Sequence, residues 1–285
     1  MSAITEMNDV LYSQRSFVDV EMEGQIAWVS INRPEKKNAI SPAVAAQMIQ
    51  TLEKLEADDR CGVVVITGTG DSFHAGMDLK DFFRVTDGMS ESARQKIYRM
   101  NAAWQWRQLM HYPKPTIAMV NGWCFGGGFC PLISCDLAIA ADDAIFGVSE
   151  INWGILPAGN VTKALSVVMP HRDAMYYIMT GETFDGKRAA QMRIVNESVA
   201  RDQLRDRTRQ LANVLLQKNP MTLRAAKDAF RRVRDMSWED ANDYLFAKLD
   251  QARLLDPEGA RAKGIKQFVD EKTYKPGLGS FDRSR

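Results

Sequence analysis

The sequence has almost no net charge, few histidines and cysteines, and no long apolar run. Its 37 Lys and Arg residues balance 36 Asp and Glu residues, which leaves a formal net charge of +1 at pH 7. A chain so close to neutral has no general attraction for nucleic acid or for an anionic membrane surface, and we expect neither as a partner. No apolar segment approaches the roughly 20 residues of a membrane-spanning helix.

The sparse histidines and cysteines argue against a metal centre. His74, His111 and His171 do not stand at the spacing from cysteines that zinc sites use, so we expect no metal. The four cysteines lie mostly in apolar surroundings, which favours buried thiols in a reducing compartment. Residues 1–9 carry acidic groups and no apolar core, unlike a secretory signal. We therefore expect a cytoplasmic protein.

Apolar strands alternate with helices over the first two thirds of the chain, which predicts an α/β fold with buried sheets. The expected strands cover residues 25–32, 62–67, 116–121, 137–140 and 145–147. A helix capped by Ser41 is expected over 42–57, and another over 91–110. Beyond residue 202 the pattern is helical, over 202–218, 221–236, 238–255 and 257–271. We expect an N-terminal extension (1–17), an α/β core (18–201) and a helical appendage (202–285).

Two glycine-containing loops follow expected strands. An apolar run ends at Asn121-Gly122, and a triple glycine and a short apolar helix come next. Bare N–H groups at a helix start can receive a negatively charged oxygen, and a missing Cβ allows close approach. With Met77 in the other loop, Gly127 can form a two-donor oxyanion hole; the alternative is that these glycines only turn the chain. A dinucleotide fingerprint is excluded, because Phe73 stands where a third glycine is required.

Glu150 is the candidate acid–base residue. It stands among Val148, Ile151 and Trp153, where poor solvation raises a carboxyl pKa toward neutrality. A helix cap or a buried ion pair is the alternative on local grounds. Asp78 and Asp136 are weaker candidates that suit capping and a helix–strand junction.

Other candidate residues carry weaker signals. Cys130 begins the apolar helix, and a core thiol is favoured over a nucleophile because no histidine is placed to activate it. Arg33, Lys36 and Lys37 follow the first expected strand and could meet ligand phosphates, although exposed basic residues are more often simply solvated.

Four segments occur in a recognisable order: residues 32–34 (NRP), 75–78 (AGMD), 121–128 (NGWCFGGG) and 146–154 (FGVSEINWG). From about Val18 to the C-terminus, this arrangement resembles the crotonase (enoyl-CoA hydratase/isomerase) superfamily. Residues 123–129 (WCFGGGF), 149–155 (SEINWGI) and 176–181 (YYIMTG) are most similar to its hydroxycinnamoyl-CoA (feruloyl-CoA) hydratase-lyase subgroup.

The resemblance implies a spiral of ββα turns and a helical C-terminal region that forms trimers or dimers of trimers. It implies a CoA thioester substrate, such as feruloyl-, coumaroyl- or caffeoyl-CoA, whose carbonyl is held by the N–H groups of Met77 and Gly127. Hydration assisted by Glu150 would be followed by retro-aldol cleavage to an aromatic aldehyde and acetyl-CoA. No cofactor besides the CoA of the substrate is implied. Residues implied in binding CoA are Arg33, Lys36, Ala75, Gly76, Asp78 and Leu79.

Departures from the family pattern affect the substrate. Enoyl-CoA hydratases carry two glutamates, but the first of these positions is Cys130 here. The subgroup meets the phenol of its substrate with two tyrosines and a serine; Phe82, Phe246 and Cys130 occupy those positions. Either Tyr244, Tyr112 or a water binds the phenol, or the substrate ring is less polar, as in cinnamoyl-CoA. Trp153 is a further candidate to line the substrate site.

Three alternatives therefore stand beside the hydratase-lyase. The first is an enoyl-CoA hydratase that stops at the β-hydroxy thioester or acts on a non-phenolic aryl-enoyl-CoA. The second is a thioester hydrolase, which would release a free acid and CoA. The third is a non-catalytic crotonase-like binding protein, against which Glu150 and the glycine loop argue.

Overall fold

The computed structural model describes residues 15–275, 277 and 279–284, so most of the expected N-terminal extension lies outside the described residues. The chain divides into two compact units. The first comprises Thr116–Arg209 and the described residues up to Tyr112; the second comprises Pro113–Pro115 and the described residues from Gln210 onward. The expected boundary between core and appendage, at 201/202, precedes the division at 209/210.

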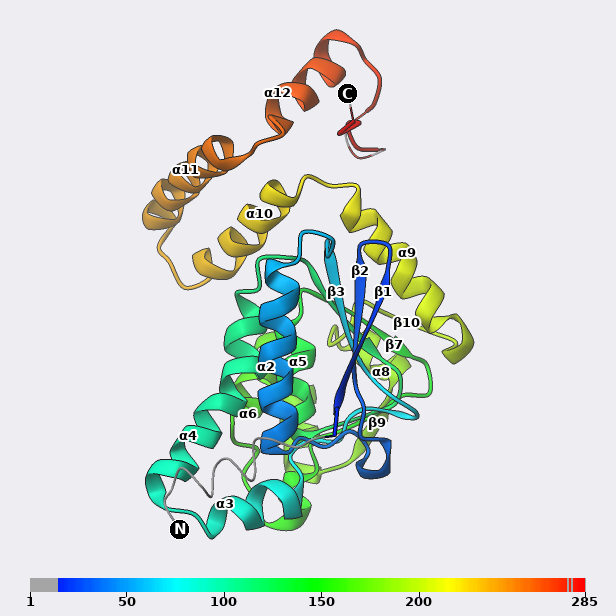
Figure 1. The fold of residues 1–285 in the computed structure, drawn as a ribbon, viewed down its shortest axis with the longest axis vertical. Coiled ribbons are helices and arrows are strands. Elements are labelled where there is room, and N and C mark those ends of the chain that lie inside the picture. Colours follow the sequence, from blue (N-terminus) through cyan, green and yellow to red (C-terminus); the bar gives the residue numbers. More distant parts are fainter. Residues whose placement is uncertain (1–14, 276, 278, 285) are drawn as a thin grey trace. The chain divides into compact units, whose positions relative to one another are not determined.

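A six-stranded sheet forms the centre of the first unit (Figure 1). Its first two strands pair antiparallel and every later pair is parallel. Parallel strands covered on both faces are apolar along their length, and β3 is buried at all six positions. In spatial order the strands are β1 (Val18–Glu23), β2 (Ile26–Ile31), β3 (Val63–Gly68), β5 (Thr116–Val120), β7 (Leu137–Ala141) and β10 (Glu197–Val199).

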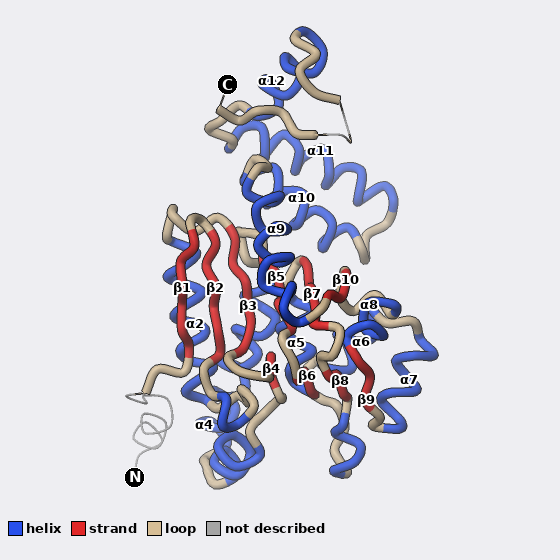
Figure 2. The backbone as a smooth tube through the Cα atoms, turned by 90° about the vertical axis from the view of Figure 1, so that its right-hand side faces the viewer, coloured by secondary structure: helices blue, strands red, loops and turns tan. Residues whose placement is uncertain are grey.

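A second, four-stranded sheet of short strands accompanies the first (Figure 2). It contains β4 (Ser72–His74), β6 (Trp123–Phe125), β8 (Ile145–Gly147) and β9 (Thr183–Asp185). The chain enters the two sheets in turn: β3 leads to β4, β5 to β6 and β7 to β8, and each pair is followed by helix. This repeat is the expected spiral of ββα turns.

Two helical segments of the first unit begin at the capping residues that the sequence indicated. Ser41 caps α2 (Pro42–Ala57), and its side chain accepts a hydrogen bond from the N–H of Val44. Asp78 caps a π-helical turn, Leu79–Arg84. The other helices of this unit are α3 (Val85–Asp87), α4 (Glu91–Ala102), α5 (Phe129–Ser134), α6 (Val161–Val168), α7 (His171–Thr180) and α8 (Gly186–Gln191).

The structure corrects several expected elements. Residues 72–74 and 123–125, expected as loop, are strands β4 and β6; β1, β9 and β10 were also not expected. Apart from β1, each of these strands has only three residues, which is too few to show an alternating pattern. The single helix expected over 91–110 changes at Ala103 into a π-helical turn that ends at Gln108.

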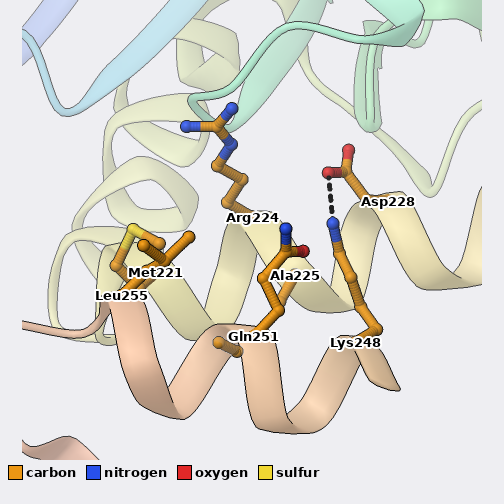
Figure 3. A pocket seen from close by; sticks show the side chains of 8 residues that line it. Met221, Arg224, Ala225, Asp228, Lys248, Gln251 and Leu255 are labelled. Atoms are coloured by element: carbon orange, nitrogen blue, oxygen red, sulfur yellow. Dashed lines mark hydrogen bonds and ion pairs between the residues drawn. The ribbon is translucent and has the colours of Figure 1, made fainter. Parts of the chain in front are cut away.

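The second unit is helical, as expected. Helix α9 (Leu204–Leu216) spans the division, and α10 (Pro220–Val233), α11 (Trp238–Leu255) and α12 (Ala260–Ile265) follow. Helices α10 and α11 pack against each other, and Lys248 Nζ donates to Asp228 Oδ2 at 3.1 Å between them (Figure 3). The helix expected over 257–271 begins later, at Ala260, and its last turn, Lys266–Asp270, is π-helical.

Candidate active site

Three loops meet at one edge of the four-stranded sheet. Strands β4, β6 and β8 are neighbours and run parallel, so their carboxyl ends share an edge. The chain leaves β4 into Ala75–Asp78, leaves β6 into Gly126–Gly128 and leaves β8 toward Glu150. The carboxyl edge of parallel strands is the usual place for ligands in α/β proteins. Sheet topology thus brings together the two glycine loops and the candidate acid.

Hydrogen bonds to Ile40 fix the Gly76–Met77 peptide and thereby orient the N–H of Met77. The carbonyl of Gly76 accepts a hydrogen bond of 2.8 Å from the N–H of Ile40, and the N–H of Asp78 donates to the carbonyl of Ile40 at 3.0 Å. In a trans peptide the N–H points opposite to the carbonyl. The N–H of Met77 therefore points away from Ile40, on the side opposite the Gly76 carbonyl.

Gly127 lies directly against this peptide. A Cβ built on Gly127 would stand 3.8 Å from the nitrogen of Met77, and one built on Gly76 would stand 3.4 Å from the nitrogen of Gly127. In the described part of the chain, neither N–H has a hydrogen-bond acceptor. Two unpartnered N–H groups side by side are what an oxyanion hole requires. The geometry is compatible with the expected pair of donors.

Glu150 stands on the 3₁₀ turn Ser149–Trp153, beside the glycine loop. A Cβ on Gly126 would lie 2.6 Å from Glu150 Oε1. Glu150 Oε2 is buried and has no hydrogen-bond partner among the described residues. Burial raises the pKa of this carboxyl, more than a backbone hydrogen bond lowers it. Glu150 is therefore a poorly solvated carboxyl with one oxygen left without a protein hydrogen bond, which suits a general acid–base.

Cys130 lies close enough to Glu150 for the carboxylate charge to affect the pKa of the thiol. Burial, and then the Glu150 carboxylate, raise the pKa of Cys130 to about 12. The thiol donates to the carbonyl of Gly159 at 3.2 Å. A thiol held protonated in this way is a poor nucleophile. The structure therefore agrees with the interpretation of Cys130 as a core thiol.

Arg33 is buried rather than solvated. Its Nη1 donates to Asp78 Oδ2 at 2.8 Å, and its Nη2 pairs with Asp81. Burial alone would raise the pKa of Asp78, but the N–H groups of Asp81 and Lys80, together with Arg33, lower it. The guanidinium thus holds the loop that follows Met77. Asp78 caps the next helical turn, as its sequence context suggested.

The other candidates occupy mixed positions. Phe82 is fully buried in a cluster with Ala93 and Ile97, and Met77 packs against that cluster. Lys36, Leu79 and Trp153 are exposed, and Ala75 is half-buried. Tyr244 and Phe246 lie on α11, in the second unit. Contact of these residues with a substrate stays a prediction.

His74 lies beside the site, but the sequence analysis considered it only as a metal ligand and did not identify it as a site residue. It ends β4, is fully buried, and its Nδ1 accepts the N–H of Gly76 at 2.9 Å. Its position directly before Ala75-Gly76-Met77 is the only sequence signal that could have identified it. Among the described residues, no group of His, Cys, Asp or Glu side chains is arranged to hold a metal ion.

Comparison with known proteins identifies the family. The family model for enoyl-CoA hydratase/isomerase matches residues 21–275. This chain belongs to the enoyl-CoA hydratase/isomerase family. A hydroxycinnamoyl-CoA hydratase-lyase of Pseudomonas fluorescens is 57% identical over 93% of this chain and 96% of its own length. The 2,3-dehydroadipyl-CoA hydratase of Escherichia coli is 30% identical over 89% and 96% of the two chains.

Solved structures of the family share the fold. A crystal structure of an enoyl-CoA hydratase subunit from Geobacillus kaustophilus matches with a TM-score of 0.81 and 26% identity, over 94% of this chain and 99% of that one. The ββα spiral described above is thus the fold of this enoyl-CoA hydratase/isomerase family member. No helix in the described ranges is long and apolar enough to span a bilayer.

Proposed function

We propose that this chain hydrates a hydroxycinnamoyl-CoA and then cleaves the hydrated thioester into an aromatic aldehyde and acetyl-CoA. The observation that carries the proposal is the lone carboxyl of Glu150, poorly solvated and placed against the glycine loop. The 57% identity to a protein named hydroxycinnamoyl-CoA hydratase-lyase supports the substrate class. Family membership supports a CoA thioester.

The first half-reaction adds water across the Cα–Cβ double bond. Glu150, as carboxylate, takes a proton from water while the hydroxide bonds to Cβ, and the electron pair moves onto the thioester carbonyl. The N–H groups of Met77 and Gly127 stabilise the resulting enolate, whose charge is larger than that of the bound substrate. Protonated Glu150 then delivers its proton to Cα. The product is the β-hydroxy thioester.

The second half-reaction reverses the roles of the same groups. Glu150 takes the proton of the β-hydroxyl, the Cα–Cβ bond breaks, and an aldehyde forms at Cβ. The electron pair of that bond again becomes an enolate in the oxyanion hole, and the Glu150 proton converts it to acetyl-CoA. Both halves are redox-neutral, so the mechanism needs no redox cofactor, and the N–H groups of Met77 and Gly127 supply the enolate stabilisation. One carboxyl suffices because the proton that Glu150 takes in each half-reaction is returned to the enolate carbon. Cys130, with its raised pKa, contributes no second base.

A second candidate is cleavage of a less polar substrate, such as cinnamoyl-CoA. It is favoured by Phe82, which adds an apolar ring beside Met77 where a tyrosine would offer a hydroxyl. A buried phenol with no partner would lose about 1–3 kcal/mol of binding free energy. Feruloyl- and coumaroyl-CoA remain our first choice because the segments around the site match the hydroxycinnamoyl subgroup.

The deciding experiment incubates the purified protein with feruloyl-CoA and, separately, with cinnamoyl-CoA, and identifies the products by liquid chromatography and mass spectrometry. Vanillin and acetyl-CoA are the expected products of feruloyl-CoA, and Glu150→Gln is the control that should form neither. A β-hydroxy thioester without aldehyde would overturn the lyase step. Free acid with CoA would indicate hydrolysis. A protein that binds the thioester but turns over neither substrate would be a binding protein.

We further propose that the CoA moiety lies along Ala75, Gly76, Asp78 and Leu79, with Lys36 near its phosphates. Lys36 and Leu79 are exposed, as contact with an incoming ligand requires. Arg33 contributes by holding Asp78 and Asp81, because its guanidinium is already engaged by both carboxylates. Four buried thiols are consistent with a reducing, cytoplasmic location.

The helical second unit is proposed to assemble the chain into trimers or dimers of trimers. Large apolar side chains on its helices are exposed in the single chain, among them Trp238 at 90% and Phe230 at 77%. Monomeric proteins rarely expose such apolar surface without a partner. Analytical ultracentrifugation should show a mass of three or six chains; a monomer at micromolar concentration would contradict this proposal.

A further inference from the structure

We propose that His74 is a positioning residue for the oxyanion hole: its Nδ1 holds the Gly76 N–H and so fixes the peptide directly before the one whose N–H, that of Met77, receives the thioester carbonyl. The inference rests on the proposed function for the identity of the thioester, and on the geometry of the loop for the role of His74.

Two consecutive peptides of the loop are fixed from different sides. The N–H of Gly76 donates to His74 Nδ1 at 2.9 Å, which orients the Ala75–Gly76 peptide. The carbonyl of Gly76 accepts from Ile40, which orients the Gly76–Met77 peptide. Gly76 itself has a φ of +87°, so no side chain restricts rotation between these two peptides. Without the His74 acceptor, the Ala75–Gly76 peptide could turn at this glycine, and the donor of Met77 would be held by the Ile40 hydrogen bonds without support from the preceding peptide.

The imidazole is itself held by a buried network that returns to Met77. The ring of His74 stacks on that of Trp104, with centroids 6.1 Å apart and planes inclined by 14°. Trp104 Nε1 donates to Asn101 Oδ1 at 3.3 Å. Asn101 Nδ2 in turn contacts Met77 Sδ at 3.3 Å. The loop is therefore secured at both ends, at Gly76 through the imidazole and at Met77 through its thioether.

The protonation state of His74 suits a permanent acceptor. Burial lowers the pKa of His74 to about 3, so the ring is neutral at pH 7. Because Nδ1 accepts a hydrogen bond, the single ring proton lies on Nε2. Nε2 is buried and has no partner within the described residues. A phenylalanine would fill the same space without a buried unpaired donor, so packing alone does not account for a histidine here.

The test replaces the acceptor while keeping the ring. His74→Phe removes Nδ1, and His74→Asn offers an amide oxygen near the same place. We expect kcat for feruloyl-CoA to fall by roughly 10- to 100-fold in His74→Phe, with KM changed less than about threefold, because the carbonyl interaction strengthens in the transition state. His74→Asn should recover most of the loss. Phe73→Leu, a substitution of the fully buried neighbour on β4, is the matched control for loss of packing alone.

A second readout measures the oxyanion hole without turnover. Dihydroferuloyl-CoA lacks the double bond and cannot be hydrated, so its ¹³C-labelled thioester carbonyl can be followed by infrared difference spectroscopy. Binding to the wild type and to Phe73→Leu should shift the carbonyl band to lower wavenumber. The shift should shrink in His74→Phe and return in His74→Asn. If His74→Phe is too unstable to purify, His74→Leu replaces it in both assays.

The outcomes separate this inference from the proposed function. A full carbonyl shift and near-normal kcat in His74→Phe would overturn the role of His74. That role would also be overturned if the wild type bound the probe without any shift, since the oxyanion hole would then lie elsewhere. A shifted carbonyl in a wild type that releases no aldehyde would overturn only the lyase step, and the His74 comparison would still be decided by the spectra.

Discussion

The carboxylate of Glu150 rests against the backbone of Gly126, so closely that a Cβ on Gly126 would stand 2.6 Å from Oε1 and 3.1 Å from the carboxyl carbon. Gly126 also has a φ of +47°, in the left-handed region that favours glycine. A glycine at position 126 therefore does two things: it leaves room for the Glu150 carboxylate and it allows the left-handed loop conformation. Its two neighbours contribute differently, Gly127 by its N–H group and Gly128 by passing close to the His74 backbone.

The first prediction concerns Gly126→Ala. The added methyl would displace the Glu150 carboxylate, and we expect kcat to fall at least about 100-fold, as small misplacements of reacting groups do. Gly24→Ala is the matched control: φ is +58° and no atom lies within 4 Å of the added Cβ. Both substitutions carry about 1–2 kcal/mol of backbone strain. Steady-state kinetics and thermal unfolding of the two variants would distinguish displacement from strain; equal activity losses would contradict our interpretation.

The second prediction concerns the activity of Glu150→Gln. The amide cannot carry protons between water, Cα and the β-hydroxyl, so we expect both hydration and cleavage to fall by about 10²- to 10⁴-fold. KM should change little, because the thioester is held mainly by other groups. Single-turnover assays that follow the β-hydroxy thioester and the aldehyde separately would check this. Loss of cleavage with hydration intact would show that another group assists the addition of water.

The third prediction concerns the stability of Glu150→Gln. The substitution that lowers activity should raise the stability of the folded protein. A carboxyl whose pKa is raised in the folded state opposes folding while it is ionised. The wild type should therefore gain stability as pH falls through the raised folded value toward the ordinary 4.5. Glu150→Gln has no such titration, so its melting temperature should exceed that of the wild type at pH 8, with a difference that shrinks as the pH is lowered. A constant difference from pH 8 to pH 5 would contradict this linkage.

Much of the site could be predicted from local sequence, because the features that matter are backbone features. A strand end, a glycine run and a lone acid among apolar residues indicate an anion-accepting loop and a desolvated carboxyl. The chain order of the motifs then specified the family and, with it, the ββα spiral. The two glycine loops also suggested Met77 and Gly127 as a pair of donors, but 50 residues of sequence separate them, and the adjacency of β4 and β6 in the structure is what brings them together.

The features that sequence reasoning missed depend on long-range burial. Nothing in the order Asn32-Arg33-Pro34 shows that the guanidinium will be enclosed by Asp78 and Asp81, more than 40 residues away. Nor does His74 signal that its ring will stack on Trp104. The three-residue strands β4 and β6 were missed because they are defined by pairing with each other rather than by a pattern of their own.

The fourth prediction separates two roles for Arg33. Because Arg33 and Asp78 are both buried, Arg33→Met leaves the Asp78 carboxylate without its counter-charge and should lower the unfolding free energy by about 3–5 kcal/mol. The two backbone N–H groups that donate to Asp78 remain and reduce this loss. Urea denaturation measures this cost. If the guanidinium only holds the loop, KM should rise equally for feruloyl-CoA and for the feruloyl thioester of N-acetylcysteamine, which lacks phosphates. A rise confined to feruloyl-CoA would instead show direct contact with the CoA phosphates.

The fifth prediction concerns the ring of the substrate. Phe82 belongs to the apolar cluster against which Met77 packs, and Tyr98 meets its ring edge-on at 5.2 Å. If Phe82 also faces the aromatic end of the substrate, Phe82→Tyr would place a hydroxyl within reach of the phenol of feruloyl-CoA. A hydrogen bond gained there is worth about 1 kcal/mol, so kcat/KM for feruloyl-CoA relative to cinnamoyl-CoA should rise by about fivefold. The ratio is its own control, because a destabilised core lowers both values alike. An unchanged ratio with a lower melting temperature would assign Phe82 to packing and would leave the phenol to Tyr244 or water, because the buried hydroxyl of Tyr112 already donates to the carbonyl of Leu52 at 2.7 Å.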